Sequence, residues 1–408
     1  MAELFRRELY LERLRPFYDT DLIKVVTGMR RCGKSCLMQT VMEELRERGV
    51  GEDRITYLDL DARRYRRVRD PDTFDKAIEA AIGEDPRGSY LFVDEVQNVE
   101  GFEEVVEAWR LEGVSIFITG SNSYLLSGEL ATKLTGRYVE LELFTLAFPE
   151  WLGMREALGE EIGPTAAEFE RYLREGGMPG AVRLPNPAAR SAYVADVIAQ
   201  VIEKDVSRRA GKVRNAEAFR RVMTYMVSNY AAPTNFANIA EELREAQGTP
   251  VLARTVSRYA GYLEAAKVLY RCPTFDLKSR RSLHGGEKHY LADLSLYYAL
   301  NTDNQVSYGP ALENVVYQYL RRHGWTVSVG RVGRLEVDFI ARKDQRYVYV
   351  QVSMSIVDQN VEEREFRPFS LIRDGWPRYL LTLDPLPTTR DGVTHLNIAE
   401  LMASDADL

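Results

Sequence analysis

Four short runs rich in apolar residues mark the first third of the chain. They lie at residues 22–27, 89–93, 114–119 and 138–143. Such runs are typical of strands that are buried on both faces of a parallel sheet. The segment at 35–47, between the first two runs, has the apolar spacing of a helix. Buried strands that alternate with helices predict a three-layer α/β fold with a parallel sheet.

Helical periodicity dominates the middle of the chain. Between residues 188 and 230, apolar residues recur every three or four positions, which predicts a long helical segment. Two further helices are expected at 236–244 and 253–265, and β-rich pieces follow at 268–272 and 288–291. Two helices followed by two strands indicate a winged helix.

The end of the chain combines one helix with several strands. The helix is expected at residues 312–323, and the strands are expected at 326–329, 336–341 and 347–352. This pattern predicts a second, smaller α/β region. Because 408 residues exceed the usual length of one domain, several domains are expected.

The strongest chemical signal is the pattern G-x-x-x-x-G-K-[ST] at residues 28–35, between an expected strand and an expected helix. Gly28 and Gly33 let the loop curl so that successive N–H groups point inward. Lys34 can then reach the β- and γ-phosphates of a nucleotide, and Ser35 can offer its hydroxyl to Mg²⁺. The positive end of the helix favours the same phosphates. We therefore predict a site for ATP and Mg²⁺.

Four other side chains belong to the predicted nucleotide site. Arg30 and Arg31 lie inside the loop, where they can contact phosphate or remain solvated or ion-paired. Cys32 also lies in the loop; a redox role is conceivable, but a small residue that fills the loop is the favoured interpretation. Cys36 follows Ser35 in the sequence and is included in the site.

Two acidic residues follow the run at 89–93. At the end of such a strand, Asp94 is expected to hold Mg²⁺, and Glu95 is expected to polarise the attacking water. After the run at 114–119, Asn122, or else Ser121, can contact the γ-phosphate or orient the water. The alternative is that this Asn/Ser turn only caps the next helix.

Arg137 precedes the run at 138–143. A guanidinium there can face the nucleotide site of a neighbouring subunit or sense its own nucleotide, where it stabilises charge on the transferred phosphoryl group. The alternative is an arginine in a surface ion pair.

These motifs together resemble the AAA+-type ATPases. More narrowly, they are similar to a bacterial and archaeal ATPase family whose C-terminal part is a restriction-endonuclease-like domain of unknown function. The resemblance rests on these segments: 27–35, 91–97, 118–122, 134–137, 176–179 and 288–293. It implies ATP binding, hydrolysis and a tripartite layout. Along the chain we expect an AAA+ core in 1–150, a helical lid in 151–232, a winged helix in 233–300 and a nuclease-like domain in 305–408.

The expected winged helix contains a basic stretch. Its second helix can present Arg254 and Arg258 to a major groove. Residues 267–290 hold six basic residues against two acidic ones. This local excess makes double-stranded DNA a candidate partner, and packing or protein contact is the alternative.

The C-terminal region retains part of a PD-(D/E)xK nuclease pattern. Glu313 and Asp338 fall where that fold keeps acidic residues. Gln351 stands in place of the second carboxylate, and Ser353 stands in place of the lysine. Cleavage needs carboxylates for Mg²⁺ and a lysine for the water, so the nuclease site is expected to be broken.

Composition and charge limit the class of protein and the cellular compartment that we expect. A net charge of −7 excludes a globally basic nucleic-acid-binding protein but allows a local basic patch. Three cysteines cannot form a disulfide framework, and no zinc-ligand spacing is present. The sequence has no run of 18 apolar residues, and its acidic start lacks the apolar segment of a secretory signal. We therefore expect a cytoplasmic protein that does not enter a membrane.

The leading interpretation is an ATP-hydrolysing switch or small motor. Its nucleotide state is expected to be coupled to a winged helix that binds DNA or an unknown protein partner, and a homo-oligomer is one arrangement. A second interpretation is a nucleotide-dependent DNA-binding regulator or interaction protein without useful hydrolysis. The least favoured is an ATP-regulated DNA nuclease.

Overall fold

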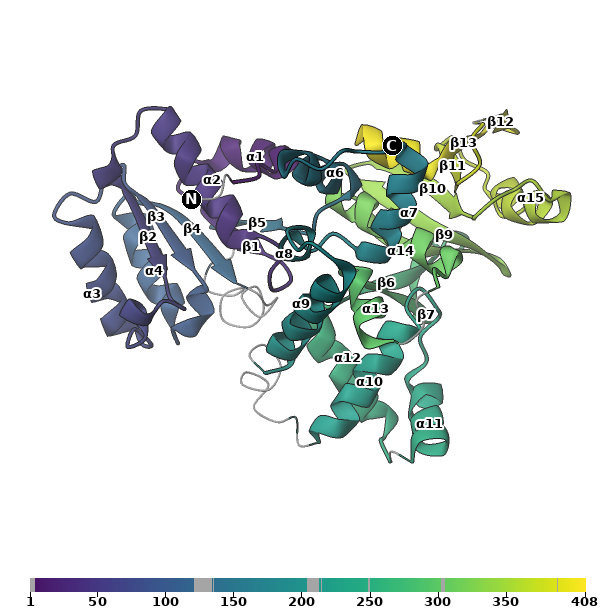
Figure 1. Cartoon of the computed structure of the whole chain (residues 1–408), viewed down its shortest axis with the longest axis horizontal. Helices are drawn as coiled ribbons and strands as arrows, with labels where there is room; N and C mark the ends of the chain where they lie inside the picture. The colour runs from purple at the N-terminus through teal and green to yellow at the C-terminus, as the bar shows by residue number, and fades with distance from the viewer. Residues whose placement is uncertain are drawn as a thin grey trace. The chain divides into compact units, whose positions relative to one another are not determined.

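The structure is a computed structural model of the whole chain, shown in Figure 1. It describes all residues except 1–3, 121–133, 135, 204–212, 214, 249, 302–304 and 387. The chain divides into two compact units: the first contains residues 1–143 with 265–267, and the second contains 144–264 with 268–408.

The first unit is built on a parallel sheet of five strands in the order β2-β3-β4-β1-β5. The strands are β1 (Ile23–Thr27), β2 (Ile55–Asp59), β3 (Tyr90–Asp94), β4 (Ser115–Gly120) and β5 (Tyr138–Glu142). The sequence prediction of a parallel sheet is thus confirmed. Because β4 lies between β1 and β3, its end separates the phosphate loop from the acidic pair.

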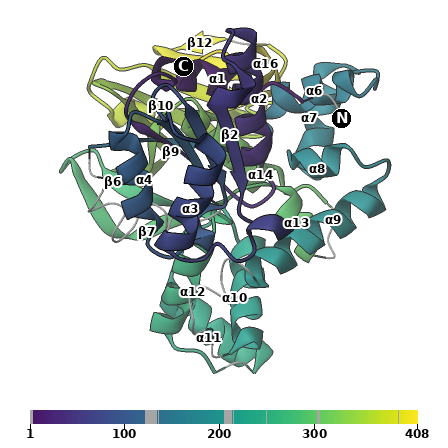
Figure 2. The ribbon, with the colours of Figure 1, turned by 90° about the vertical axis from the view of Figure 1, so that its left-hand side faces the viewer.

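Helices cover both faces of this sheet. On one face, α1 (Glu8–Leu14) and α2 (Lys34–Glu47) bury Leu11, Met38 and other apolar side chains against the strands. On the other face, α3 (Pro71–Ile82) and α4 (Phe102–Leu111) contribute the apolar residues of a second core. Figure 2 shows α3 and α4 in front of the strands. The result is the predicted three-layer fold.

The second unit begins with helices. They are α6 (Phe148–Ala157), α7 (Thr165–Glu175), α8 (Pro179–Val182), α9 (Pro187–Gln200), α10 (Ala216–Ser228), α11 (Phe236–Gln247), α12 (Ala253–Ala265) and α13 (Ser295–Leu300). The long helical segment expected at 188–230 is therefore divided. A new helix begins after Asn215, whose side chain accepts a hydrogen bond from the N–H of Ala218 at 3.0 Å.

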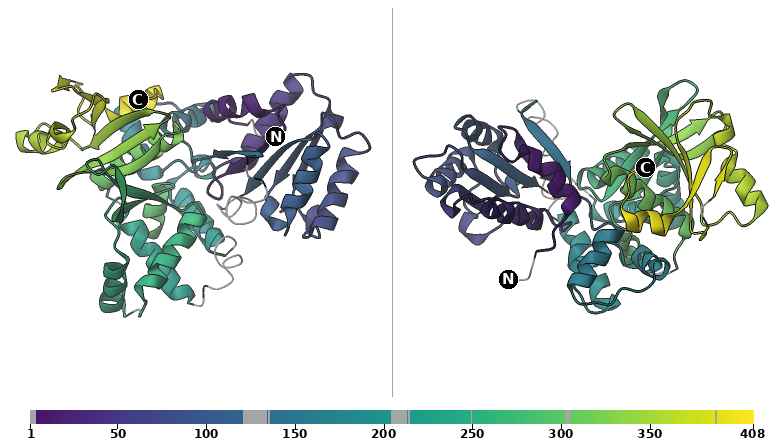
Figure 3. Two further views of the ribbon diagram at one scale, coloured as in Figure 1. Left: turned by 180° about the vertical axis from the view of Figure 1, so that it is seen from behind. Right: turned by 90° about the horizontal axis from the view of Figure 1, so that it is seen from above.

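An eight-stranded mixed sheet forms the rest of the second unit, in the order β12-β13-β11-β10-β9-β8-β6-β7. Its strands are β6 (Leu269–Asp276), β7 (Arg281–Leu291), β8 (Thr326–Val332), β9 (Leu335–Lys343), β10 (Arg346–Val352), β11 (Arg378–Thr382), β12 (Thr389–Arg390) and β13 (Val393–Asn397). The helices beside it are α14 (Tyr308–Arg322), α15 (Gln359–Phe366) and α16 (Ile398–Ser404). Figure 3 shows this sheet from two sides.

The strands expected in the winged helix and those expected in the nuclease-like domain form this one sheet. β6 and β7 are an antiparallel pair, and β6 also pairs with β8 in parallel, with Thr274 opposite Val329. The wing-like hairpin is therefore continuous with the C-terminal strands. Within the described part of the chain, the structure contains no helix that is both long and apolar enough to cross a membrane.

Candidate functional site

The phosphate loop connects the end of β1 to the start of α2 in a tight curl. Gly28 has a φ of 148° and Gly33 a φ of 108°. A Cβ atom on Gly28 would lie 2.2 Å from the carbonyl oxygen of Leu143 and 2.9 Å from Sγ of Cys32. Glycine is therefore required at residue 28 by both conformation and space.

Lys34 is folded into this curl. Its Nζ donates hydrogen bonds to the carbonyl oxygens of Gly28, at 2.9 Å, and Met29, at 3.1 Å. Ser35 lies beside it, half-buried in the first turn of α2. An ammonium group, a hydroxyl and the N–H groups of a helix start are the donors that a nucleotide phosphate and its Mg²⁺ require, so these residues fit ATP with Mg²⁺.

The remaining predicted loop residues differ in their surroundings. Cys32 is fully buried, and burial raises the pKa of its thiol, which supports the interpretation that it fills the loop. Arg30 is buried, whereas Arg31 is exposed and adopts a φ of 67°. Cys36 is exposed on α2.

Asp94 lies at the end of β3, where two hydroxyl groups hold its carboxylate. The hydroxyl of Tyr57 donates to Oδ2 at 2.9 Å, and the hydroxyl of Thr119 donates to Oδ1. Thr119 comes from the neighbouring strand β4 and also accepts a hydrogen bond from the N–H of Glu95 at 3.1 Å. The carboxylate is thus fixed at the edge of the sheet where the phosphate loop begins.

Thr119 and Tyr57 were not among the predicted site residues. The run at 114–119 predicted the strand but not its neighbours, because strand order is not visible in the sequence. A hydroxyl residue at the end of a buried strand, directly before Gly120, was the one available signal. Asn122 and Ser121, which were predicted instead, lie outside the described residues.

Glu95, the predicted base, directly follows Asp94 and is half-buried. Burial raises the pKa of its carboxyl, although the positive charges of Lys34 and Arg30 act in the opposite direction. The side-chain amide of Gln97 donates to Oε2 of Glu95. The backbone of Glu95 has a φ of 56°, an uncommon conformation for a residue with a side chain. A carboxylate whose proton affinity is raised is suited to accept a proton from water.

Arg137 lies at the end of the sheet where the strands begin, whereas its own phosphate loop lies where the strands end. Its carbonyl oxygen accepts a hydrogen bond from the N–H of Ile23, the first residue of β1, whereas the loop follows the last residue of that strand. Five residues of strand separate the two ends by about 16 Å. The exposed guanidinium forms an ion pair with Glu107 on α4 at 2.6 Å. This placement does not support sensing of its own nucleotide.

A second polar cluster lies in the other unit, where the nuclease-like pattern was predicted. Asp338 on β9 accepts a hydrogen bond from the N–H of Val352 at 2.8 Å, and its own N–H donates to Oε1 of Gln351 at 3.2 Å. Gln351 in turn donates to Glu365 at 2.8 Å. Burial, and then the charge of Glu313, raise the pKa of Asp338 well above its usual range.

A lysine from a strand that was predicted to belong to the winged helix joins this cluster. Nζ of Lys288 on β7 lies 3.0 Å from Glu313 and 2.8 Å from Glu336. The structure therefore brings Glu313, Asp338 and Gln351 together and adds a positive charge that Ser353 cannot supply. Nothing in the sequence near Ser353 indicated Lys288, because β7 is distant along the chain. Among the described residues, no three His, Cys, Asp or Glu side chains are arranged to hold a metal ion.

Half of the basic residues counted at 267–290 are neutralised. Lys267 pairs with Glu142, Arg271 pairs with Glu287 at 2.8 Å, and Lys288 belongs to the cluster above. The three others are exposed at the turn between β6 and β7: Lys278, Arg280 and Arg281. Arg254 and Arg258 are exposed on α12, as the winged-helix interpretation requires.

Two motifs that carried the family resemblance meet in the second unit. The carboxylate of Asp293 accepts hydrogen bonds from the N–H of Gly177 and the N–H of Ser295, each at 2.9 Å. The carbonyl oxygen of Gly177 accepts from the N–H of Leu146 at 2.7 Å. We call these residues the glycine–aspartate joint. Its contacts are structural, since the side chain of Asp293 is buried.

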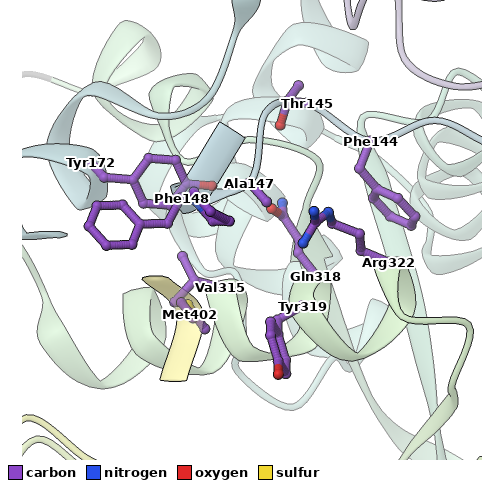
Figure 4. Close-up of a pocket in the computed structure, with 11 residues that line it drawn as sticks. Phe144, Thr145, Ala147, Phe148, Tyr172, Val315, Gln318, Tyr319, Arg322 and Met402 are labelled. Atoms are coloured by element: carbon purple, nitrogen blue, oxygen red, sulfur yellow. The ribbon is translucent and has the colours of Figure 1, made fainter. Parts of the chain in front are cut away.

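A small cavity lies near this joint, lined by residues of the segment at 144–149 and of α7, α14 and α16, as Figure 4 shows. Its volume is about 20 Å³, which is room for roughly one water molecule. The hydroxyl of Tyr319, which lines it, is buried without a hydrogen-bond partner. This cavity is too small for a nucleotide.

Comparisons with known proteins agree with the fold of the first unit. Residues 20–152 match the family described as an AAA domain, and residues 166–306 match a domain of unknown function, DUF8612. A Walker-type ATPase of Pyrococcus abyssi has a similar structure, with a TM-score of 0.50 and 14% identity over 72% of this chain and 95% of that chain. At this identity the likeness concerns the fold alone.

Two sequence relatives span most of the chain. An uncharacterized protein of Methanocaldococcus jannaschii is 26% identical over 357 residues, which cover 85% of this chain and 78% of that protein. An uncharacterized protein of Haemophilus influenzae is 32% identical over 382 residues, which cover 93% of each chain. The chain therefore belongs to the same family as this Haemophilus influenzae protein, and its N-terminal part is an AAA domain of the P-loop ATPase type.

Proposed function

We propose that the chain binds ATP with Mg²⁺ at residues 28–36 and hydrolyses it. The observation that carries this proposal is the pairing of Asp94 and Glu95 through Thr119, directly beside the strand that ends in the phosphate loop. Lys34 and the N–H groups of the loop bind the phosphates. Ser35 and Asp94 hold Mg²⁺, which neutralises charge on the phosphates.

Glu95 acts as the base in this proposal. Its raised pKa supports transfer of a proton from the attacking water to its carboxylate. Asn122 is proposed to orient that water or contact the γ-phosphate. Arg137, which lies far from its own loop, is proposed to serve the nucleotide site of a neighbouring copy, and this role requires a homo-oligomer.

The nucleotide state is proposed to control a winged helix at 233–300, which contacts double-stranded DNA or a protein partner in the cytoplasm. The exposed Arg254 and Arg258 on α12 support DNA. A regulator that binds ATP without hydrolysing it is the alternative to a switch or motor driven by hydrolysis. The preserved base Glu95 favours hydrolysis.

Nucleotide trapping by a Glu95→Gln variant tests the proposal. The variant keeps the loop but loses the base, so we expect it to retain ATP, not ADP, after gel filtration, whereas wild-type protein retains ADP. Lys34→Ala serves as the control that binds neither nucleotide. Recovery of ADP from Glu95→Gln at the wild-type rate would contradict the role of Glu95.

The degenerate nuclease-like domain is proposed to be a scaffold. Lys288 supplies a positive charge, but its ammonium is already paired with Glu313 and Glu336, and Asp338 is held by the N–H of Val352. We expect no cutting of plasmid DNA with Mg²⁺ or Mn²⁺. Cutting by wild-type protein that disappears in Asp338→Ala would establish a nuclease instead.

A further inference from the structure

A wide cleft in the second unit is separate from the nucleotide site and from the polar cluster around Asp338, and it includes Lys278 and Arg280 of the basic stretch. It has a volume of about 760 Å³, within the range of ligand-binding pockets. Its lining comes from the turn between β6 and β7, the end of β8, strands β9 and β10, and the segment at 371–376. We call it the aromatic cleft.

Aromatic side chains lie along one side of the aromatic cleft. The rings of Tyr347 and Trp376 have centroids 5.8 Å apart at an angle of 53°, and Trp376 is 37% exposed. Tyr347 is half-buried, and Tyr349, two residues further along β10, shares its sheet face but is buried beneath the cleft surface. Exposed aromatic faces are stacking platforms for planar ligands.

Four exposed basic side chains also line the aromatic cleft: Lys278, Arg280, Arg342 and Arg373. Arg342 lies directly opposite Tyr347 in the pairing of β9 with β10. Among the ion pairs found in the described part of the chain, none involves any of these four. The acidic residue in the lining is Asp374, whose carboxylate accepts hydrogen bonds from the hydroxyl of Tyr349, at 2.6 Å, and the N–H of Trp376.

We propose that the aromatic cleft binds single-stranded nucleic acid. Unpaired bases stack on Trp376 and Tyr347, while the phosphates between them contact the four basic side chains. A duplex fits this surface poorly, because its base faces are already stacked and cannot reach the aromatic rings. An acidic peptide matches the charge but has no planar groups to stack on Trp376. The proposal goes beyond ATP hydrolysis and does not require it.

Fluorescence anisotropy with a labelled 12-nucleotide oligo(dT) tests this inference on the full chain. We expect tighter binding of the single strand than of a 12-base-pair duplex. Trp376→Ala weakens single-strand binding by about tenfold, whereas Trp376→Phe, which keeps a ring, stays within about threefold of wild type. Binding also quenches tryptophan fluorescence in wild-type protein but not in Trp376→Phe. Of the three other tryptophans, Trp151 and Trp325 are buried, and the half-buried Trp109 lies on α4 and does not line the cleft.

The salt dependence tests the basic residues. For a single strand, each phosphate contact contributes about 0.7 to the slope of log K against log salt, so Arg342→Ala combined with Arg373→Ala lowers the slope by about 1.4. Arg183→Ala is the control, because this exposed arginine does not line the cleft. We expect Arg183→Ala to leave affinity and slope unchanged.

Three results would overturn the inference. The first is single-strand binding that Trp376→Ala and the double arginine variant leave unaltered. The second is tighter binding of the duplex than of the single strand, if this binding is lost when Arg254→Ala and Arg258→Ala are combined. That result would assign DNA binding to α12. The third is equal competition by poly-glutamate, which assigns the cleft to acidic peptides. Lys34→Ala should still bind the oligonucleotide, so failure of the ATPase proposal is distinguishable from failure of this one.

Discussion

At the scale of single residues, one hydroxyl group connects the two acids of the candidate active site. Thr119 donates to the carboxylate of Asp94 and accepts from the N–H of Glu95. Both acids could be predicted from the sequence, because an acidic pair at the end of a buried strand is a local pattern. Thr119 could not, since its role depends on β4 lying between β1 and β3.

Replacing Thr119 by valine should separate catalysis from binding. The loss of a hydrogen bond to a buried carboxylate should lower the free energy of unfolding by about 1–3 kcal/mol. The displaced acids should lower kcat for ATP by roughly tenfold to a hundredfold, while ATP affinity changes little. Steady-state kinetics measures the change in kcat, and chemical denaturation measures the change in the free energy of unfolding. Thr119→Ser, which keeps the hydroxyl, should retain near-wild-type kcat; equal loss in both variants would argue against the hydroxyl.

The raised pKa of Glu95 predicts the acid side of the pH profile. A base must be deprotonated to accept a proton, so kcat/KM should fall as pH decreases through the pKa of the free protein. Because burial raises that pKa, the midpoint should lie above the ordinary glutamate value of about 4.3. As a control, ATP binding by Glu95→Gln is measured over the same pH range, because titration of ATP itself can also change kcat/KM. A midpoint at or below the ordinary value would contradict this environment.

At the scale of elements, the glycine–aspartate joint explains two motifs whose purpose the sequence did not reveal. Gly177 and Asp293 are far apart along the chain, but the structure connects them by a buried hydrogen bond of 2.9 Å. The helical periodicity at 188–230 likewise predicted helices but not the new start at Ala216. Local patterns predict the type of element, whereas contacts between elements depend on the folded chain.

Gly177→Ala should destabilise the second unit. A Cβ atom there would lie 2.0 Å from the carbonyl oxygen of Leu146, a backbone atom that cannot move alone. We expect a loss of several kcal/mol in the free energy of unfolding, measured by denaturant titration. Gly261→Ala is the matched control, because its Cβ meets no atom within 4 Å inside α12. That variant should be as stable as wild type or slightly more stable; similar destabilisation in both would contradict the steric account.

At the scale of the whole molecule, the sequence predicted the first unit far better than the second. The phosphate loop and buried strands are contiguous motifs with a known local geometry. The single sheet that joins β6 and β7 to the C-terminal strands depends on a parallel pairing between distant segments. Lys288 lies on β7, which joins this sheet through its own pairing with β6, so no local pattern could reveal its place in the polar cluster.

Mixing two inactive variants tests whether copies of the chain share active sites. If Arg137 serves a neighbouring site, Arg137→Ala lacks the arginine and Glu95→Gln lacks the base, so mixed assemblies contain some complete sites. We expect the mixture to recover ATPase activity that neither variant has alone. Arg110→Ala is the control, since Arg110 contacts the same Glu107. An unaltered rate in Arg137→Ala, or no recovery in the mixture, would leave Arg137 as a surface ion pair.

Phosphate release from ATP by the purified full chain tests the central claim most directly. The account predicts Mg²⁺-dependent release that is linear in time, continues beyond one turnover per chain, and is abolished by Lys34→Ala and Glu95→Gln. Arg183→Ala, an exposed arginine outside the nucleotide site, should release phosphate at the wild-type rate. Release by wild-type protein no faster than by Lys34→Ala, with or without nucleic acid, would contradict ATP hydrolysis at the phosphate loop.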